Sequence, residues 1–374
     1  MYIEISREVV TFAEHNNRYA IEMLEKLALA VKYNKHIVFT GLRLLDRILQ
    51  IDSLDALTKN QYSKIRNRYS TIGALIHKLD FRAVVLMGGE NRRTRKRILI
   101  DSTKADKFEV YEESHLLTEN LQDGKFFEYL VKKYAKNQGI TLSGTPICYM
   151  PQMGGGSTIA MVYKMEIERC QHFCLSILDS DKRYPSCGKG ETFSSLRRVD
   201  KDKYLGDCDG NDGQYAFNCS YYVMDELREL ENLIPIEVLK TMDNVRSNPL
   251  LQMTFDMSYH DMKDGLLAKK VNVGDYQIYL DKLFSFDQAI VDYIDFCVAY
   301  RQCCGDKEEY EKDCGRLKLV NGLGSNIMEQ VLKNAQPALE HADFSKLSLS
   351  QKKEWENIGK KIFEWCCFLD LGIS

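Results

Sequence analysis

Apolar residues recur at helical spacing through the first part of the chain. Between residues 5 and 31 the positions that carry this pattern are Val9, Phe12, Ala13, Ala20, Met23, Leu24, Leu27 and Val31. Residues three and four apart share one face of an α-helix, so the spacing predicts amphipathic helices, with a break at Asn16 and Asn17. The same pattern predicts helices over residues 36–49 and 62–79. Residues 1–107 are therefore predicted to be a mainly helical N-terminal region.

The pattern changes to short apolar runs after residue 81. A β-branched run over residues 82–87, turn residues and a second run over residues 97–100 predict a β-hairpin or a similar excursion with a basic tip. The basic residues of this tip are Arg92, Arg93, Arg95, Lys96 and Arg97. They could contact nucleic-acid phosphates, form a solvated loop or provide a protein-docking surface, and the sequence leaves these three interpretations open.

The middle of the chain alternates between predicted strands and helices. Strands are expected over residues 115–118, 146–150, 173–178 and 215–223, and helices over residues 124–137 and 157–169. This alternation predicts βαβ units, and therefore an α/β domain with a parallel sheet and helices on both faces, over residues 108–235. Residues 236–374 are predicted to be mainly helical, with helices over residues 275–284, 286–300, 309–317 and 351–368.

Composition excludes several classes of protein. Of the 374 residues, 44% are hydrophobic and 28% are charged, which is ordinary for a globular protein. The sequence has no run of 18 apolar residues and no secretory leader pattern, so we expect a cytoplasmic protein without a membrane-spanning helix. In that setting the 12 cysteines are expected to be reduced thiols.

The charge is unevenly distributed along the chain. Residues 1–107 contain 20 Lys and Arg against 12 Asp and Glu, whereas the rest contains 31 against 42. A basic first third joined to an acidic remainder is typical of a polyanion-binding arm beside a carboxylate-rich site. Chance variation between segments would produce the same asymmetry, and the sequence does not separate the two.

The candidate chemical groups lie where predicted strands end. These site and turn residues are Glu119, Asp123, Gly154, Gly155, Gly156, Asp179 and Asp181. Ligands of an open parallel sheet bind beyond the carboxyl ends of its strands, so we expect Glu119, Asp179 and Asp181 to face one crevice. Three carboxylates at one edge repel one another unless a cation lies between them. Oxygen ligands favour a hard ion, Mg²⁺ or Mn²⁺, which serves phosphoryl chemistry.

This ordered set resembles the topoisomerase–primase (Toprim) domain over residues 114–235. The resemblance implies that Glu119 is the general acid/base and that Asp179 and Asp181 bind Mg²⁺. A later acidic segment is similar to one in Toprim nucleases of the overcoming-lysogenization-defect type and their standalone relatives. By that match Glu231, and less directly Glu229, would be further metal ligands, although glutamates in such a segment are more often solvated helix charges.

Two features limit the resemblance and define what it implies. Asn120 stands where the family usually has glycine, but Asn tolerates a left-handed backbone best among the other residues. These 374 residues contain no G-x-x-x-x-G-K-[ST] string, so we expect no fused ATPase of that type.

The function expected from the resemblance is a metal-dependent nuclease that acts on DNA, RNA or tRNA. We expect it to be an effector of a prokaryotic anti-phage system, with a separate ATPase or other protein as regulator. Lys182 and Arg183, which follow the Asp pair, are expected to contact substrate phosphates. The alternative is a non-catalytic nucleic-acid-binding or scaffold protein with a degenerate crevice. The oligomeric state stays open.

Overall fold

The computed structural model describes residues 1–94, 96–140, 147–204, 217–252, 257–267, 274–285, 288–292, 294–295 and 318–368. Contacts divide the chain into two units. Unit 1 consists of Met1–Leu178, Ser194–Tyr222 and Asn357–Ser374, and unit 2 consists of Asp179–Phe193 and Val223–Glu356. These units join segments far apart in sequence, so they do not follow the predicted boundaries after residues 107 and 235.

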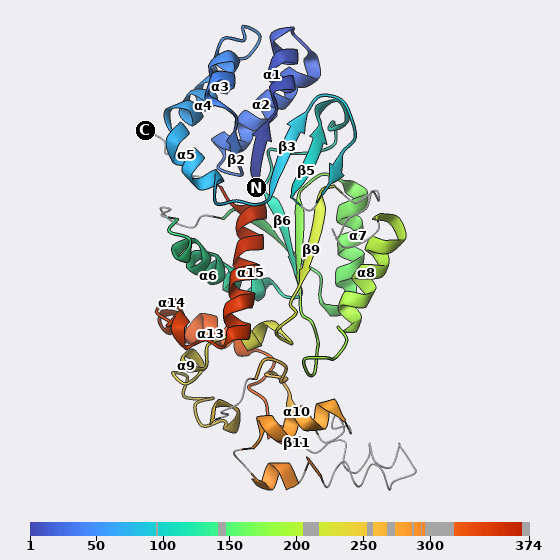
Figure 1. The fold of residues 1–374 in the computed structure, drawn as a ribbon, viewed down its shortest axis with the longest axis vertical. Coiled ribbons are helices and arrows are strands. Elements are labelled where there is room, and N and C mark those ends of the chain that lie inside the picture. The colour runs from blue at the N-terminus through green and yellow to red at the C-terminus, as the bar shows by residue number, and fades with distance from the viewer. Residues whose placement is uncertain are drawn as a thin grey trace. The chain divides into compact units, whose positions relative to one another are not determined.

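Unit 1 begins with a five-stranded sheet in the order β2-β1-β3-β5-β4 (Figure 1). Its strands are β1 (Tyr2–Ile5), β2 (Ile37–Phe39), β3 (Arg82–Leu86), β4 (Arg92–Arg93) and β5 (Arg97–Asp101). All pairs are parallel except β4 with β5, which are antiparallel. The N-terminal region is therefore an α/β assembly around a sheet that the helical pattern did not reveal.

Five helices accompany this sheet: α1 (Arg7–Glu14), α2 (Arg18–Lys32), α3 (Leu42–Leu49), α4 (Ala56–Asn67) and α5 (Tyr69–Ile76). The predicted break between the first two is confirmed, because Asn16 adopts a left-handed φ of 58° and the Asn17 side chain accepts a hydrogen bond from the Ala20 N–H. The helix predicted over residues 36–49 is wrong at its start. Ile37 and Val38 pair with β1 instead, and the helix begins after Gly41.

The hairpin predicted between residues 82–87 and 97–100 does not form. Both segments are strands, but β3 and β5 pair in parallel. After β3 the chain turns at Gly88 and Gly89, whose φ angles are 78° and 111°, and passes to the far side of β5. On that side β4 and β5 form a smaller hairpin, and Arg92, Arg93 and Arg97 lie on its two strands.

The second sheet of unit 1 has the order β7-β6-β8-β9 and confirms the predicted α/β class with a parallel sheet. Its strands are β6 (Ser114–Thr118), β7 (Tyr149–Met153), β8 (Cys174–Leu178) and β9 (Cys219–Val223), whose last residue belongs to unit 2. The main connecting helices are α6 (Leu121–Asn137), α7 (Ile159–Arg169) and α8 (Glu191–Tyr204), with a short 3₁₀ turn, η1 (Ser102–Lys104), before β6 and another, η2 (Gly156–Thr158), before α7.

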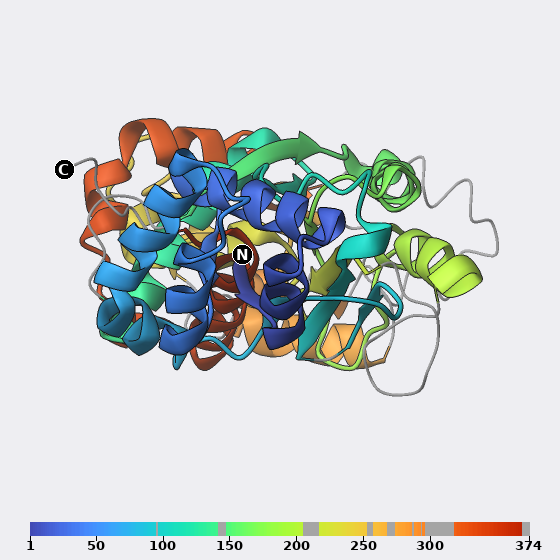
Figure 2. The same ribbon diagram turned by 90° about the horizontal axis from the view of Figure 1, so that it is seen from above.

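The chain crosses this sheet in both directions, so its helices cover both faces. β7 lies on one side of β6 and β8 on the other, and right-handed crossovers then place α6 and α7 on opposite faces. Figures 1 and 2 show α7 and α8 side by side, on the flank opposite α6. The prediction from sequence that helices cover both faces of this sheet is therefore confirmed.

The C-terminal helix α15 (Leu349–Cys366) completes the core of unit 1 with its second half. The Trp365 ring stacks on Phe81 at 5.3 Å between centroids, and the Trp365 carbonyl accepts a hydrogen bond from the Ser114 hydroxyl. Gly359 allows α15 to approach α6, because a Cβ atom there would lie 2.7 Å from the Cβ of Tyr134.

Unit 2 is built from short elements, which match the predicted helical region only in part. They are η3 (Leu230–Leu233), α9 (Ile236–Leu239), η4 (Pro249–Gln252), β10 (Gly265–Leu267), α10 (Asp275–Leu283), β11 (Lys318–Asn321), α13 (Ile327–Asn334), α14 (Gln336–Glu340) and η6 (Phe344–Lys346). β10 and β11 form an antiparallel ribbon that was not predicted. The helix expected over residues 309–317 lies outside the described residues, and that over residues 286–300 lies largely outside them.

No helix within the described ranges is long and apolar enough to span a membrane.

Candidate acidic site

Glu119 directly follows β6 in a turn fixed by local hydrogen bonds. The Thr118 hydroxyl donates to the carbonyl of Asn120 at 2.7 Å, and the Asn120 N–H donates to the Asp123 carboxylate at 2.9 Å. Asp123 therefore caps the start of α6, where a carboxylate also complements the helix dipole. The half-buried Glu119 lies between these hydrogen-bonded residues, at the carboxyl end of the central strand β6.

The glycine turn after β7 supports the same edge of the sheet. The Gly154 N–H donates to the carbonyl of Thr118 at 2.8 Å, and the Gly155 N–H donates to the carbonyl of Glu119 at 3.2 Å. A Cβ atom on Gly154 would lie 2.5 Å from Ile159, so only glycine fits there. Gly155 and Gly156 have φ angles of 51° and 45°, which suit glycine. The predicted role of these glycines in a turn is consistent with this geometry.

Asp179 directly follows β8 and begins unit 2. Its Oδ1 accepts a hydrogen bond from the Leu230 N–H at 3.0 Å. The backbone N–H groups of Ser180 and Asp181 both donate to the carbonyl of Arg228 at 2.9 Å. The segment that carries Asp179 is thus bound to residues 228–230, the acidic segment of the resemblance.

Asp181 is exposed and has a left-handed backbone with φ of 54°, which is uncommon outside glycine. A Cβ atom on Gly190 would lie 2.3 Å from the Oδ2 atom of Asp181, so a glycine is required opposite this carboxylate. The next two residues differ: Arg183 is exposed, whereas Lys182 is buried and its ammonium donates to the Asp225 carbonyl at 3.1 Å. Of the two basic residues expected to contact phosphate, Arg183 is the accessible one.

Contacts with Asp225 fix the position of the Lys182 side chain. The carboxylate of Asp225 lies 3.5 Å from the Lys182 ammonium and 3.4 Å from that of Lys189. Burial opposes ionisation of Asp225, but the two ammonium groups outweigh this effect and hold the pKa of the carboxyl below its ordinary value. Lys182 therefore has a structural partner within unit 2.

Glu229 and Glu231 lie buried beside Lys263. The Lys263 ammonium is 3.1 Å from a Glu231 carboxylate oxygen and 3.7 Å from a Glu229 oxygen. The other Glu229 oxygen accepts hydrogen bonds from the Met262 and Lys263 N–H groups at 2.8 and 3.3 Å. Burial and the adjacent Glu231 raise the pKa of Glu229 to about 7, against the opposing charge of Lys263.

Lys263 is the cation that contacts both glutamates, and the Arg228 guanidinium also lies 4.0 Å from a Glu229 carboxylate oxygen. The pKa of Lys263 is raised: burial disfavours its charge, but the negative charges of Glu231, Glu229 and Asp179 outweigh that effect. Both glutamates are almost fully buried, so the interpretation of solvated helix charges does not apply to them. Their carboxylates are compensated by the Lys263 ammonium group, which could not be predicted from local pattern because Lys263 lies more than 30 residues away in the chain.

Within the described parts of the chain, no group of three or more His, Cys, Asp or Glu side chains is arranged to hold a metal ion. Glu119 belongs to unit 1, whereas Asp179, Glu229 and Glu231 belong to unit 2. A metal site that uses them all stays a prediction. What the structure does show is the buried cluster of Lys263, Glu229 and Glu231 within unit 2.

The basic run is only partly exposed. Arg92, Lys96 and Arg97 are exposed, but Arg93 is buried and its guanidinium donates to the Ser220 hydroxyl. Arg95 lies outside the described residues. Arg93 therefore ties the β4–β5 hairpin to β9 within unit 1, and the remaining exposed cations are the candidates for a phosphate contact.

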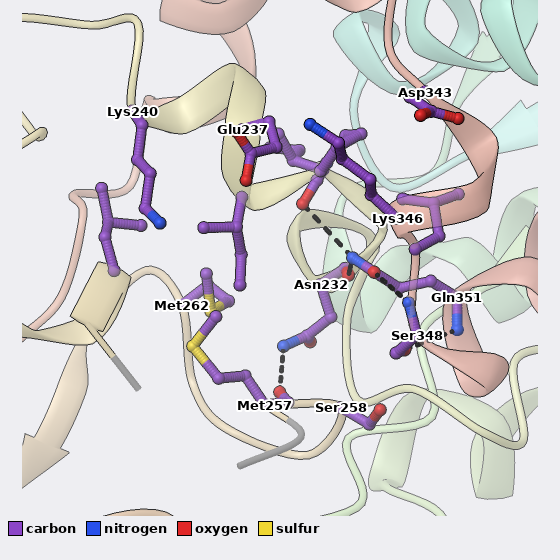
Figure 3. Close-up of a pocket in the computed structure, with 15 residues that line it drawn as sticks. Asn232, Glu237, Lys240, Met257, Ser258, Met262, Asp343, Lys346, Ser348 and Gln351 are labelled. Atoms are coloured by element: carbon purple, nitrogen blue, oxygen red, sulfur yellow. Dashed lines mark hydrogen bonds between the residues drawn. The ribbon is translucent and has the colours of Figure 1, made fainter. Parts of the chain in front are cut away.

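A pocket of about 430 Å³ lies in unit 2 (Figure 3). Its apolar lining includes Met257 and Met262, and Asn232 forms part of its wall. The Asn232 amide donates to the carbonyls of Met257 and His260 at 2.8 and 2.9 Å, and its oxygen accepts from the Glu229 N–H at 2.9 Å. Asn232 thus joins the wall of the pocket to the backbone that holds Glu229.

Asn232→Ala is expected to destabilise unit 2 by about 2–4 kcal/mol, because it leaves one buried N–H and two buried carbonyls without this partner. The measurement is the midpoint of urea unfolding, and Asn244→Ala, which alters an exposed residue, is the matched control. Equal midpoints for the two variants would show that the amide does not organise the cluster.

Comparison with known proteins finds no matching family model, no matching curated protein and no matching solved structure. The assignment of function therefore depends on the geometry of this chain.

Proposed function

We propose that this protein is a metal-dependent nuclease whose site lies at the carboxyl edge of the β7-β6-β8-β9 sheet. One observation carries the proposal: β6 and β8 are neighbouring parallel strands, and each is followed directly by a carboxylate, Glu119 and Asp179. The register pairs Leu117 with Ser176, so the two strands end within one residue of each other. Ligands of open parallel sheets bind at such an edge.

The donor chemistry fits Mg²⁺ or Mn²⁺ at Glu119 and Asp179. Mg²⁺ is commonly held by one or two carboxylates together with substrate phosphates, so a larger protein cage is not needed. Glu229 and Glu231 fit less well as ligands, because the Lys263 ammonium already compensates them. When bound, the ion would neutralise phosphate charge and activate a water molecule.

The side chains of this chain supply the remaining parts of the proposed reaction. Glu119 would accept or donate a proton, and the Leu230 N–H fixes one oxygen of Asp179 so that the other is oriented. Asp181 would add negative charge at the same loop, and Arg183 would hold a substrate phosphate. Lys182 is left out of these roles because Asp225 binds it.

The biological setting that we propose depends on the family resemblance and not on the geometry of the site. The Toprim resemblance supports an anti-phage effector in the cytoplasm that a separate ATPase or other protein regulates. The second candidate function, a nucleic-acid-binding or scaffold protein, is favoured by one observation: the Lys263 ammonium neutralises two of the predicted ligands.

The two functions differ in their response to metal. The experiment is incubation of end-labelled DNA, total RNA and tRNA with the full chain in Mg²⁺, Mn²⁺ or excess chelator. Cleavage in metal that chelator abolishes supports the nuclease. Substrate binding that is equal with and without chelator, with all substrates intact, supports the binding protein instead.

The exposed cations of the basic run give a separate prediction. If Arg92, Lys96 and Arg97 each contact a phosphate, replacing all three by Gln should reduce the slope of log K against log salt by about 2–3. The measurement is a salt titration of binding to labelled nucleic acid in chelator. Lys125, Lys132 and Lys136, exposed on α6, provide the control variant. An unchanged slope would assign the run to protein docking or solvation.

A further inference from the structure

A second pocket in unit 2 is lined by tyrosine rings. Its volume is about 510 Å³, and its lining includes Tyr184, Tyr259, Tyr279 and Ile278. We call it the tyrosine pocket. Ile278 is 54% exposed, whereas Tyr259 and Tyr279 are mostly buried. The pocket therefore offers aromatic and apolar surface that solvent can reach.

The rings are fixed against one another. Tyr184 stacks on Tyr276 with 6.1 Å between centroids and 29° between planes, so a second ring supports Tyr184. Tyr259 and Tyr279 meet edge to face at 6.2 Å. A backed aromatic ring loses little freedom when a flat group stacks on its other face, and such a ring is the usual platform for an unpaired base.

The charges around the tyrosine pocket favour the binding of a base over that of a phosphate. Two carboxylates line it: Glu226, which pairs with Lys353, and Asp275, which accepts a hydrogen bond from the Ser186 hydroxyl at 3.2 Å. Carboxylates repel phosphate but accept hydrogen bonds from the amino and imino groups of bases. The pocket interior therefore suits the base, and the backbone charge must be met outside it.

Cations for that backbone charge lie next to the pocket. Arg183 is exposed, adjoins Tyr184 in sequence and forms no ion pair with another described residue. Lys282 is part of the lining. An aromatic platform flanked by cations is the pattern by which proteins bind single-stranded nucleic acid.

The tyrosine pocket is also tied to the candidate acidic site through one loop. Tyr184 follows Asp181 by three residues within the segment Asp179–Phe193 of unit 2. The Cys187 N–H donates to the Tyr184 carbonyl at 3.0 Å and fixes the turn. A base held by Tyr184 would place its own strand beside the loop that begins with Asp179.

We propose that the tyrosine pocket binds an unpaired nucleobase of the substrate strand, so that the protein selects single-stranded DNA or RNA, or loops, over duplex. A paired base has both faces covered by its neighbours and cannot enter. The inference rests on the proposed nuclease function for its substrate, but it is tested by binding alone.

The test uses the full chain in excess chelator and an oligonucleotide that carries 2-aminopurine, as a single strand and as a duplex. The wild type and Tyr184→Phe should bind the single strand more tightly than the duplex and quench its fluorescence. Tyr184→Ala should bind the single strand about 5- to 150-fold more weakly and quench it less, because one stacked base is lost. Tyr33→Ala, at a 56% exposed tyrosine of unit 1, is the matched control and should match the wild type.

The outcomes separate this inference from the proposed function. Equal affinity of the wild type for single strand and duplex, or unchanged binding and quenching by a folded Tyr184→Ala variant, overturns the tyrosine pocket. Loss of binding by Tyr184→Phe as well would also overturn it, since stacking is retained there. Failure of wild type to cleave any substrate in Mg²⁺ or Mn²⁺ removes the nuclease proposal while the binding result still stands.

Discussion

Glu119→Gln and Asp179→Asn should each abolish cleavage while the fold is retained. Both changes are nearly isosteric, and each removes one negative charge. Glu119→Gln removes a proton-transfer group, and general acid–base catalysis alone contributes about 10²–10⁴-fold. Asp179→Asn weakens a predicted ligand but keeps an oxygen that can accept the Leu230 N–H. The measurement is single-turnover cleavage of the best substrate, with any activating partner supplied.

The control for this prediction is substrate binding by the same variants in chelator. Full binding with lost cleavage supports catalysis at Glu119 and Asp179. Glu113→Gln, which alters a carboxylate just before β6 in an ion pair with Lys35, serves as the matched variant and should cleave normally. Robust cleavage by both Glu119→Gln and Asp179→Asn would mean that the catalytic residues lie elsewhere.

Lys263→Met is expected to destabilise unit 2 by about 3 kcal/mol. Removing one partner of a buried ion pair leaves an uncompensated charge, which destabilises by about 3–5 kcal/mol, and the lower end applies because the Lys263 side chain is 27% exposed. The expected readout is a lower midpoint of denaturant unfolding. Combining Lys263→Met with Glu231→Gln should recover part of the loss, since the nearest orphaned charge is then also removed.

The matched control is Lys240→Met, at an exposed lysine of the same unit. It should leave the unfolding midpoint nearly unchanged, because surface charges contribute little. Equal stability of the Lys263→Met and Lys240→Met variants would show that the ammonium does not hold the cluster together. Recovery by the added Glu231→Gln change is the stricter test, because a lysine that acts only through its aliphatic chain would not produce it.

Local patterns predicted β6, α6 and β8 well because each has a strong signature of its own, whereas β7 continues three residues beyond the strand predicted over residues 146–150. The runs that became β6 and β8 are short, apolar and bounded by polar turns, and α6 has a clear helical period. In the first sheet the runs that form β3 and β5 were predicted, but β1 and β2 were missed, because β1 has only four residues and leads directly into α1. A strand that short is recognised only from its partners, which here are residues 37–39 and 83–85.

The candidate site shows the same limit. Glu119, Asp179 and the glycine turn could be found from sequence because each lies at the end of a patterned strand. Lys263, Asp225 and Asn232 could not, because their roles arise from contacts with residues far along the chain. The basic run appeared uniform in sequence, yet the structure divides it, since Arg93 is buried against Ser220.

The most direct test of the central claim is a crystal structure of the full chain grown with Mn²⁺, with the ion located from its anomalous scattering. The account predicts a Mn²⁺ ion bound by carboxylate oxygens of both Glu119 and Asp179, beyond the ends of β6 and β8. It also predicts that Lys263 keeps its contacts with Glu229 and Glu231. Crystals in which Glu119 and Asp179 share no ion, or in which Mn²⁺ binds only at other residues, would contradict the account.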